Sequence, residues 1–519
     1  MNSKMDLKSE NSERQARKNT FGVKSKKEIK SDRFLLATTF VSGMSIMAVE
    51  MCASRLLAPY FGTSLFVWTN IIGIIMIALS IGYYFGGKIA DKYQSKILFY
   101  SIILGSGAYL CLVPFVSKYI MQFSIKAINT ASVGLFFSSL FATLIIFAIP
   151  LAFLGMISPF AIRLCAKSLE KTGSTAGSIY SLSTVGSIVG TFIPAILAIP
   201  FIGTKNTIII FSSLLMLFAI IGLRKKVLSI FLVLSLLVFF GGGAIRPDSN
   251  IVYETESVYN YIQVINESDV YSLKLNEGHA IHSKYNANNV RSGGIWSYFL
   301  SLPLIKENVS DTLIIGLAAG SISKQYLYYF PQMHIDGVEI DPKIVEAGKK
   351  YFDMNEKNLD IFIEDGRTFL QKSEKKYDII ITDAYKQPYI PFHLATKEYF
   401  ELVRGHLGKN GVAAINVGTT SETSEVLFMI TNTMSSVFEH VYMLQVPGYL
   451  NYVVYGSDID YNPNMILSVL DSRFYDIKRD VLFNPKKVIH QPNKIVLTDD
   501  KAPVEVYTDL MILDYARKS

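Results

Sequence analysis

Three acidic residues in the second half of the chain stand where chemistry on a nucleoside-bearing ligand would need them. Glu339, Asp365 and Asp383 each follow closely after a short apolar run that is typical of a strand. The carboxyl ends of parallel strands meet at one edge of an open sheet, so we expect these side chains to lie together there. The first can accept hydrogen bonds from both hydroxyls of a ribose, and the second from an adenine amino group. Asp383 can orient an amine and accept its proton, as a catalytic carboxylate does.

Glycines at the same strand ends would let a ligand approach the backbone closely. An apolar strand turns through Gly316 and Gly320 into a helix, and Ala318 stands where a GxGxG loop has its middle glycine. Glu339 follows Gly316 by 23 residues, which suits an acid that binds a ribose. Gly366 permits a tight turn directly after the second of the three acids. Each feature is weak alone, but their order and spacing together predict an adenosyl-binding site.

Two of these acids have plainer alternative interpretations. Glu339 could be a surface acid without a ligand. Asp383 could be the N-cap of a helix or an ordinary loop carboxylate. Burial and hydrogen bonding distinguish these alternatives from the adenosyl site.

Strands and helices alternate from residue 311 onward, which is typical of a parallel α/β sheet. The expected strands are Thr312–Ile315, His334–Val338, Leu359–Ile363, Tyr377–Thr382 and Val412–Val417. The expected helices lie near Ser321–Tyr329, Pro342–Phe352, Arg367–Lys372, Thr396–His406 and Ser424–Val437. We therefore predict a Rossmann-like domain of the class I methyltransferase type over residues 311–519. A small β region over residues 250–310 precedes it, with strands near Tyr259–Asn266, Val270–Asn276 and Ala280–Tyr285.

The first half of the chain is apolar enough to form an α-helical membrane domain. Hydrophobic residues make up 50% of the chain, and the excess lies between Phe34 and Gly243. The apolar runs there are long enough, or nearly so, to cross a hydrocarbon core of about 30 Å. They are Phe34–Leu57, Leu65–Tyr84, Ile97–Val116, Gly134–Leu154, Ser178–Pro200, Thr207–Leu223 and Val227–Gly243, of which the last two are short. We predict about seven spans over residues 34–243, in contact with the lipid bilayer.

A basic tail sets the expected orientation of this membrane domain. The first 33 residues carry ten Lys and Arg against five acids. The positive-inside rule places such a tail in the cytoplasm. Seven true spans would then put the second half outside the cell, whereas adenosyl sulfonium cofactors are cytosolic. We therefore expect one run not to cross, which gives a multi-pass protein of the cell membrane with a cytoplasmic soluble domain.

The composition excludes several other kinds of site. The soluble half contains no cysteine, which rules out disulfides, thiolate metal sites and a cysteine nucleophile there. The basic tail has no aromatic interleaving and no nucleic-acid motif, so we expect no nucleic acid as a partner. We expect no metal, and we expect a small-molecule amine or another acceptor as the partner. A homodimer remains an open alternative.

Two ionisable residues near the end of the first apolar run need a separate explanation. Glu50 and Arg55 stand at or near membrane depth, where charges are costly and often mark a polar pathway or a binding site. Alternatively both lie near the interface and pair with other helices, for example Glu50 with Arg163. Gly186 and Gly190 in the fifth run form a GxxxG pair, which predicts close helix packing.

From Phe34 onward the chain resembles bacterial proteins described as fused major-facilitator/spermidine-synthase proteins. The most specific matches are Asp383–Leu394, with the sequence DAYKQPYIPFHL, and Leu497–Glu505, with the sequence LTDDKAPVE. The resemblance implies a polyamine aminopropyltransferase, which moves an aminopropyl group from decarboxylated S-adenosylmethionine to putrescine. It also implies that Glu339 binds the ribose and Asp365 the adenine, and that Asp383 helps to deprotonate the attacking amine.

Departures from the family pattern affect the expected substrate. The aspartate that holds the aminopropyl ammonium in spermidine synthases corresponds to Ala319, and the one that grips the diamine corresponds approximately to Lys386. The family's Tyr-His-Glu stretch is Trp296–Ser297–Tyr298 here. Lys386 would repel putrescine, so we expect a dicationic diamine to be a poor substrate. Lys386 suits a carboxylate instead, on intact S-adenosylmethionine or on an acidic acceptor; in the alternative interpretation it faces solvent.

The loop after Asp383 supplies the expected substrate-binding residues, Tyr385, Lys386 and His393. His393 would add a titratable group beside Asp383. Acids near the C-terminus could fold over the pocket and restore the missing negative charge; they are Asp499, Asp500 and Glu505.

The leading hypothesis is a membrane-anchored transferase of the spermidine-synthase type with an unknown acceptor. Its cosubstrate is S-adenosylmethionine or the decarboxylated form. Alternatives on the same fold are methyl transfer, aminocarboxypropyl transfer or cleavage of the cofactor. A transporter or sensor with a regulatory adenosyl site is the alternative from another class, and Glu50 and Arg55 motivate it.

Overall fold

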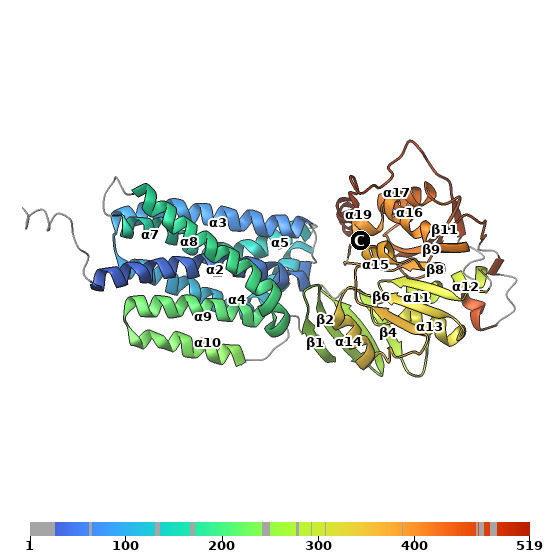
Figure 1. Ribbon diagram of the computed structural model, residues 1–519, viewed down its shortest axis with the longest axis horizontal. Helices are drawn as coiled ribbons and strands as arrows, with labels where there is room; N and C mark the ends of the chain where they lie inside the picture. Colours follow the sequence, from blue (N-terminus) through green and yellow to red (C-terminus); the bar gives the residue numbers. More distant parts are fainter. Residues whose placement is uncertain are drawn as a thin grey trace, which may run out of the picture.

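In a computed structural model, the chain folds into a helical bundle and an α/β domain joined end to end (Figure 1). The structure describes residues 26–61, 65–129, 135–166, 172–240, 250–276, 280–291, 293–306, 308–386, 388–462, 465–466, 472–477 and 485–518. Most of the expected basic tail, residues 1–33, lies outside the described residues. The order of a helical part followed by a Rossmann-like part confirms the predicted fold class.

The helices of the bundle follow the apolar runs of the sequence. They are α2 (Lys26–Phe61), α3 (Leu65–Lys92), α4 (Lys96–Asn129), α5 (Leu135–Thr143), α6 (Ile149–Gly155), α7 (Ile157–Cys165), α8 (Thr172–Phe192), α9 (Ile199–Leu223) and α10 (Ile230–Phe240). Among the described residues, five helical segments are long and apolar enough to cross a membrane, by length and composition. Large apolar side chains face outward from the bundle, as a lipid environment permits; Met76, for example, is 58% exposed and Phe201 79% exposed.

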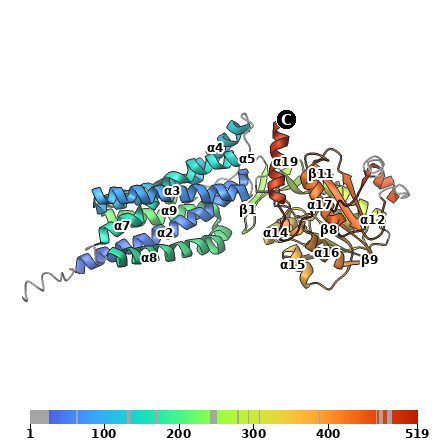
Figure 2. The same ribbon diagram turned by 90° about the horizontal axis from the view of Figure 1, so that it is seen from above.

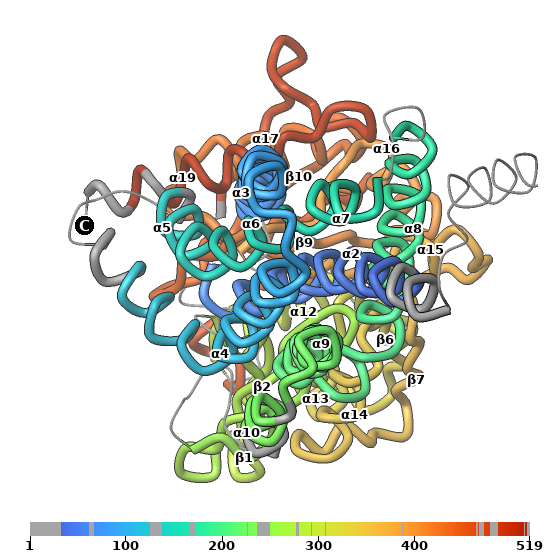
Figure 3. The backbone as a smooth tube through the Cα atoms, turned by 90° about the vertical axis from the view of Figure 1, so that its left-hand side faces the viewer, coloured from blue at the N-terminus to red at the C-terminus, as the bar shows by residue number. Residues whose placement is uncertain are grey.

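Small residues let α2 pack closely against α8 in the middle of the bundle, as the end-on view shows (Figure 3). A Cβ atom on Gly186 would lie 2.1 Å from the carbonyl oxygen of Phe40. One on Gly190 would lie 2.0 Å from the carbonyl oxygen of Met44. Because any side chain here would clash with backbone, the GxxxG pair serves close helix packing, as predicted.

One contact within the bundle and one with the α/β domain mark the two ends of the bundle. At one end, Arg163 of α7 pairs with Asp91 of α3 at 3.1 Å. At the other end, the Thr204 hydroxyl of α9 donates to Glu256 of the α/β domain at 2.6 Å. The last long apolar segment has 52 residues and bends at Gly203, where φ is +79°. It therefore runs toward the α/β domain as α8 and back as α9.

The start of α2 and the α/β domain lie at opposite ends of the bundle (Figure 2). After α9 the chain returns along α10, which lies beside α9 in Figure 1. The described parts of all seven apolar runs thus belong to the bundle. The seventh run forms α10, which has 11 residues and is not among the segments long enough to cross, so the expectation that one run does not cross stays a prediction. Basic residues gather at the end away from the α/β domain; they are Lys88, Lys92, Lys96, Arg163, Arg224 and Lys225. The suggested pairing of Glu50 with Arg163 is wrong, because Arg163 pairs with Asp91 there.

A four-stranded antiparallel sheet, in the order β1-β2-β3-β4, lies between the bundle and the main sheet. Its strands are β1 (Ile251–Glu256), β2 (Tyr261–Glu267), β3 (Val270–Leu275) and β4 (Ile281–Asn286), of which β1 was not predicted. Ser257 and Asn260, in the β1–β2 loop, donate to the carboxylate of Asp341 at 2.6 and 2.9 Å. These bonds fix the small sheet against the Rossmann-like domain.

The main sheet has eight strands in the order β12-β10-β11-β9-β8-β5-β6-β7. Five are parallel, namely β5 (Asp311–Ile315), β6 (His334–Val338), β7 (Leu359–Phe362), β8 (Tyr377–Thr382) and β9 (Leu407–Gly418). Three antiparallel strands extend the sheet beyond β9, namely β10 (His440–Gln445), β11 (Asn451–Ser457) and β12 (Pro485–Val488). The strand order reverses between β5 and β8, so their carboxyl ends open a crevice where such folds bind ligands.

Helices cover both faces of this sheet. They are α11 (Gly294–Tyr298), α12 (Ser301–Ile305), α13 (Ser321–Tyr329), α14 (Pro342–Tyr351), α15 (Gly366–Lys372), α16 (Lys397–Gly405) and α17 (Glu425–Ser435). The final helix, α19 (Val504–Lys518), packs against α17 and lies near the junction with the bundle (Figure 2).

Candidate active site

A cleft with two lobes opens between the carboxyl edge of the main sheet, the small sheet and the end of the bundle. The first lobe has a volume of about 470 Å³ and the second of about 640 Å³. Both lobes are lined by His282, Ala318, Asp383 and Tyr385. The two lobes therefore meet at the carboxylate that the sequence predicts to be catalytic.

The glycine loop after β5 adopts a backbone that brings it against the loop after β8. Gly316 has a φ of +86°, and a Cβ there would lie 2.5 Å from the carbonyl oxygen of Asp383. Gly320 has a φ of +85° and is the N-cap residue of α13. Ala318 has a φ of +49°, a conformation that glycine adopts more easily. The loop geometry is thus retained although alanine replaces the middle glycine.

Glu339, at the end of β6, is buried in the first lobe and only 7% exposed. Its carboxylate accepts hydrogen bonds from the backbone N–H of Ala318 at 2.9 Å and of Asp341 at 3.1 Å. Burial raises the pKa of Glu339 to about 7, against the opposing effect of these N–H groups. Because each carboxylate oxygen can accept more than one hydrogen bond, both can still receive a ribose hydroxyl. The surface-acid alternative is excluded.

Asp365 lines the same lobe and also caps α15. It accepts from the backbone N–H of Thr368 at 2.9 Å and lies 3.1 Å from Nε2 of His393. The hydrogen bond to His393 holds the pKa of Asp365 far below its usual value. The structure thus places His393 beside Asp365, and the prediction that it lies beside Asp383 is wrong. A Cβ on Gly366 would lie 2.2 Å from Cγ2 of Ile315, so only glycine fits this turn.

Asp383 follows β8 and projects into the cleft where the lobes meet. Its Oδ1 accepts from Nδ2 of Asn416 at 2.8 Å, and Asn416 in turn accepts from Asn451 at 2.9 Å. Burial raises the pKa of Asp383 to about 7, and the bond from Asn416 partly opposes this. No helix among the described residues begins at Asp383, which excludes the N-cap alternative. A carboxyl group that titrates near neutral pH suits proton transfer.

Tyr385 forms part of the wall between the two lobes. Its hydroxyl accepts from the backbone N–H of Gly418 at 2.6 Å and donates to the carbonyl of Asn416 at 3.1 Å. The hydroxyl is therefore committed to the protein backbone, while the ring is available to a ligand.

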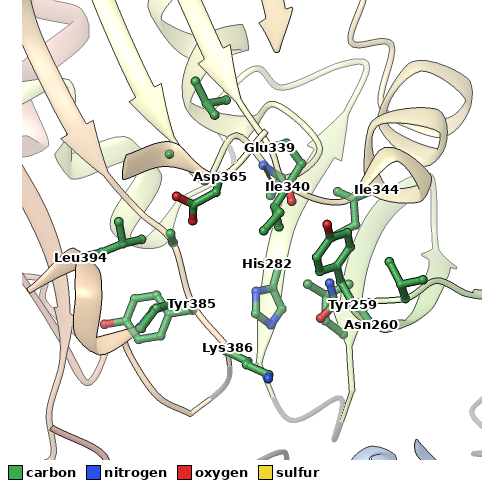
Figure 4. Close-up of a pocket in the computed structure, with 18 of the residues that line it drawn as sticks. Tyr259, Asn260, His282, Glu339, Ile340, Ile344, Asp365, Tyr385, Lys386 and Leu394 are labelled. Carbon is green, nitrogen blue, oxygen red and sulfur yellow. Dashed lines mark hydrogen bonds between the residues drawn. The ribbon is translucent and has the colours of Figure 1, made fainter. Parts of the chain in front are cut away.

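Lys386 stands at the mouth of the first lobe, at the end opposite Glu339 and Asp365, with His282 between them (Figure 4). Lys386 is exposed and lines the cavity at its mouth, so it faces both solvent and the lobe. Partial burial and then the positive charge of Arg55 lower the pKa of Lys386, and Glu505 opposes them.

The second lobe contains a single acid. Among the described residues that line it, Asp383 is the one carboxylate, and the rest are apolar, aromatic, amide or hydroxyl side chains with His282 and Lys284. Asp499 does not supply a second negative charge, because it pairs with Arg367 at 2.6 Å. Asp500 and Glu505 line neither lobe. The C-terminal acids thus add no carboxylate to the lining of either lobe, although the charge of Glu505 acts on Lys386 at the mouth of the first lobe.

Several residues of the cleft were not predicted from the sequence. Asn416 is a polar residue inside the apolar run Val412–Val417, and this position in a buried strand was a usable signal. His282 gives no such signal, because it lies in a short strand of ordinary composition. Residues of the bundle also line the first lobe, and of these only Arg55 was noted in the sequence as a possible binding residue; they are Met51, Ser54, Arg55, Trp68, Ala195 and Ile199.

One group of side chains away from the cleft could hold a metal ion. Ligand atoms of His334, Asp336 and Asp360 lie within 4.8 Å of one another. The group lies at the amino ends of β6 and β7, whereas the cleft is at the carboxyl ends. Lys375 pairs with Asp336 at 3.0 Å, so a cation already neutralises this group.

Comparison with known proteins assigns the family. Residues 300–462 match the spermine/spermidine synthase domain. A probable polyamine aminopropyl transferase of Bifidobacterium longum is 32% identical over 301 residues, which cover 53% of this chain and 67% of the relative. The chain belongs to the spermine/spermidine synthase family. A polyamine aminopropyltransferase of Vibrio vulnificus is 28% identical over 210 residues, 38% of this chain and 69% of the relative.

Two solved structures are similar to part of this spermidine synthase-like chain. A probable spermidine synthase from Corynebacterium glutamicum has 18% identity and a TM-score of 0.38, and covers 47% of this chain and 91% of its own. Spermidine synthase from Thermotoga maritima has 18% identity and a TM-score of 0.35, and covers 52% of this chain and 87% of its own. Membership of the family makes the protein a transferase, and the strand order described above makes its second half Rossmann-like.

Proposed function

We propose that this member of the spermine/spermidine synthase family is a membrane-anchored transferase. It binds S-adenosylmethionine or its decarboxylated form and transfers the aminopropyl-type chain to an amine acceptor. The observation that carries the proposal is the position of Asp383 between the two lobes. One lobe also holds Glu339 and Asp365, and the other has no further acid among its described lining residues.

The roles of the residues follow from the chemistry of a sulfonium. The sulfonium carries its own leaving group, so the protein has mainly to position the reactants. An ammonium cannot attack, and Asp383 is placed to orient the acceptor amine and take its proton. Asn416 holds one oxygen of Asp383 at 2.8 Å and so fixes the plane of the carboxylate. In the nucleoside part, Glu339 would hold the ribose and Asp365 the adenine.

A diamine with two positive charges is expected to be a poor acceptor. Putrescine would leave one ammonium in a lobe that offers no carboxylate beyond Asp383 among its described lining residues. An uncompensated charge in such a lobe is costly. An amphiphilic or singly charged amine fits this lobe better, because Tyr60 and Phe61 at the end of α2 also line it.

Turnover by the purified full chain tests the proposed function. We expect release of methylthioadenosine that depends on an added amine, with less product from putrescine than from amines of a single positive charge. Release of S-adenosylhomocysteine instead would show methyl transfer on the same fold. If no panel of amines yields methylthioadenosine from either form of the cofactor, the proposed transfer is wrong.

We further propose that the bundle spans the cell membrane as the membrane part of a fused major-facilitator/spermidine-synthase protein. The basic end of the bundle then faces the cytoplasm, by the positive-inside rule. The sequence-based expectation of a cytoplasmic soluble domain depended on one run not crossing. The cleft, however, lies at the end of the bundle opposite the basic residues, so this orientation puts it on the other side of the membrane, where the sulfonium cosubstrate must reach it.

A reporter fused after Ser519 checks this orientation. We expect an alkaline phosphatase fusion to be active and a green fluorescent protein fusion to be dark, because each folds on one side only. The same reporters fused after Arg224, at the basic end, should give the reverse pattern. A fluorescent fusion after Ser519 would contradict the proposed orientation and restore the cytoplasmic expectation.

A further inference from the structure

We infer that the first lobe recognises a carboxylate on the chain attached to the sulfonium, so that the cosubstrate is intact S-adenosylmethionine. The transferred group is then 3-amino-3-carboxypropyl rather than aminopropyl. The inference rests on the proposed function, because it concerns the same adenosyl site, and it names the form of the cofactor that this site takes.

Three nitrogen-bearing side chains in the first lobe carry this inference. Arg55 comes from α2 of the bundle, His282 from β4 of the small sheet and Lys386 from the loop after β8. Within the described part of the chain, neither Arg55 nor Lys386 forms an ion pair. Nε2 of His282 is shielded from solvent and has no hydrogen-bond partner there. Two separate elements thus bring a guanidinium and an ammonium, neither in an ion pair within the described part of the chain, to one cavity that His282 also lines.

The acids that interact with Arg55 electrostatically are committed to other donors. Glu256 accepts from the backbone N–H and the hydroxyl of Thr204. Asp341 accepts from Ser257 and Asn260, as described above. These acids stabilise the positive charge of Arg55. They form no ion pair with its guanidinium, which can still bind a ligand. An anion between Arg55 and Lys386 would also relieve the repulsion between these two cations.

Because both cations line the lobe of the adenosyl site, a carboxylate that they bind belongs to the cosubstrate and not to the acceptor. Arg55 and Lys386 line the lobe that holds Glu339 and Asp365, and neither lines the second lobe. Figure 4 shows Lys386 at the opposite end of this lobe from those two acids. A cosubstrate with its nucleoside at Glu339 would extend its amino-acid end toward His282, Lys386 and Arg55. Guanidinium and ammonium groups bind carboxylates through charge-assisted hydrogen bonds.

The decarboxylated cofactor fits this end of the lobe less well. Its chain ends in an ammonium, which would face two cations. The family pattern has an aspartate that binds this ammonium, and Ala319 stands at that position here. Ala319 is 1% exposed and its backbone N–H donates to Ser283 at 2.9 Å, so it contributes no charge to the cavity.

The reaction balances with the intact cofactor. The lone pair of the acceptor nitrogen attacks the methylene carbon bonded to sulfur and forms a new C–N bond. The C–S bond breaks, and its electron pair stays on sulfur and gives neutral methylthioadenosine. The acceptor nitrogen loses one proton to Asp383, which passes it to solvent.

Calorimetric titration of the full chain in nanodiscs tests the inference with three ligands, namely intact S-adenosylmethionine, the decarboxylated form and methylthioadenosine. A charge-assisted hydrogen bond corresponds to about tenfold or more in affinity, so we expect the intact form to bind at least about tenfold more tightly than the decarboxylated form. Lys386→Gln and Arg55→Gln should each remove most of this preference. Lys349→Gln, on the exposed surface of α14, is the matched control and should retain it.

Methylthioadenosine separates the possible outcomes. It lacks the amino-acid chain, so the variants should bind it like the wild type, which also shows that they are folded. Lys386 is exposed, and its replacement therefore tests the inference even if Arg55→Gln fails to fold. Equal or tighter binding of the decarboxylated form by the wild type overturns the inference and leaves the adenosyl site intact. Absence of methylthioadenosine binding by the wild type overturns the proposed function as well.

Discussion

Replacement of Asp383 by asparagine is expected to lower the rate of transfer by about 10²- to 10⁴-fold, the usual contribution of a general base. Asparagine keeps the shape of the side chain but cannot accept a proton from the attacking amine. Binding of the adenosyl ligand should change little, because the carboxylate faces the junction of the lobes rather than the nucleoside end. Initial rates of methylthioadenosine release, measured beside titrations of methylthioadenosine, check both expectations.

Asp360→Asn is the matched control, since this exposed aspartate is at the start of β7 and away from the cleft. It should release methylthioadenosine at the wild-type rate. A transporter or sensor with a regulatory site predicts instead that Asp383→Asn leaves function intact. Wild-type turnover by Asp383→Asn would therefore remove Asp383 from the mechanism.

The pKa of Asp383 also sets the expected pH dependence of the wild type. Burial raises this pKa to about 7, and only the ionised form can accept the proton. The value of kcat/KM should therefore rise with pH through about 7 and then level off. The residual activity of Asp383→Asn should not show this rise of kcat/KM with pH.

Replacement of Glu339 by glutamine is expected to weaken adenosyl binding by about 10- to 100-fold. The change removes the charge from both hydrogen bonds that the ribose hydroxyls would make. It also weakens the bonds from Ala318 and Asp341 that shape the glycine loop, at 2.9 and 3.1 Å. Titration with methylthioadenosine measures the loss without any contribution from the amino-acid chain.

Glu346→Gln provides the control for this measurement. Glu346 lies on α14 and forms an exposed ion pair with Lys343 at 2.8 Å, outside the cleft. Such surface pairs contribute little, so its affinity for methylthioadenosine should match that of the wild type. Equal affinities of Glu339→Gln and Glu346→Gln would show that Glu339 does not contact the ligand.

Much of the Rossmann-like domain could be predicted, because its strands are short apolar runs followed by helices with clear starts. His334–Val338 and Tyr377–Thr382 match the predicted strands residue for residue, and Ser321–Tyr329 matches the predicted helix. Strand β9 is longer than predicted, since it begins at Leu407 in a polar stretch that pairs with β8. Strands β10 to β12 were missed, because their place in the sheet depends on pairing with β9 and not on a local pattern.

The meeting of three acids at one sheet edge could also be predicted. Lys386 and Arg55 were each noted in the sequence, but their presence in one lobe could not be predicted. Glu339, Asp365 and Asp383 follow predicted strands, and the topology of the sheet alone brings them to one edge. Arg55 and Lys386 are more than 300 positions apart in the sequence and come together through the docking of the bundle on the α/β domain. No local sequence pattern predicts that two such distant residues line one lobe. His393 was assigned to the wrong carboxylate because the fold of its loop is not a periodic pattern.

An experimental structure of the full chain with bound methylthioadenosine tests the central claim most directly. We predict one ligand in the first lobe, with its ribose hydroxyls in hydrogen-bond distance of Glu339, its adenine amino group near Asp365 and its sulfur facing Asp383. Methylthioadenosine bound elsewhere, or bound in this lobe without contacts to Glu339 and Asp365, would contradict the account.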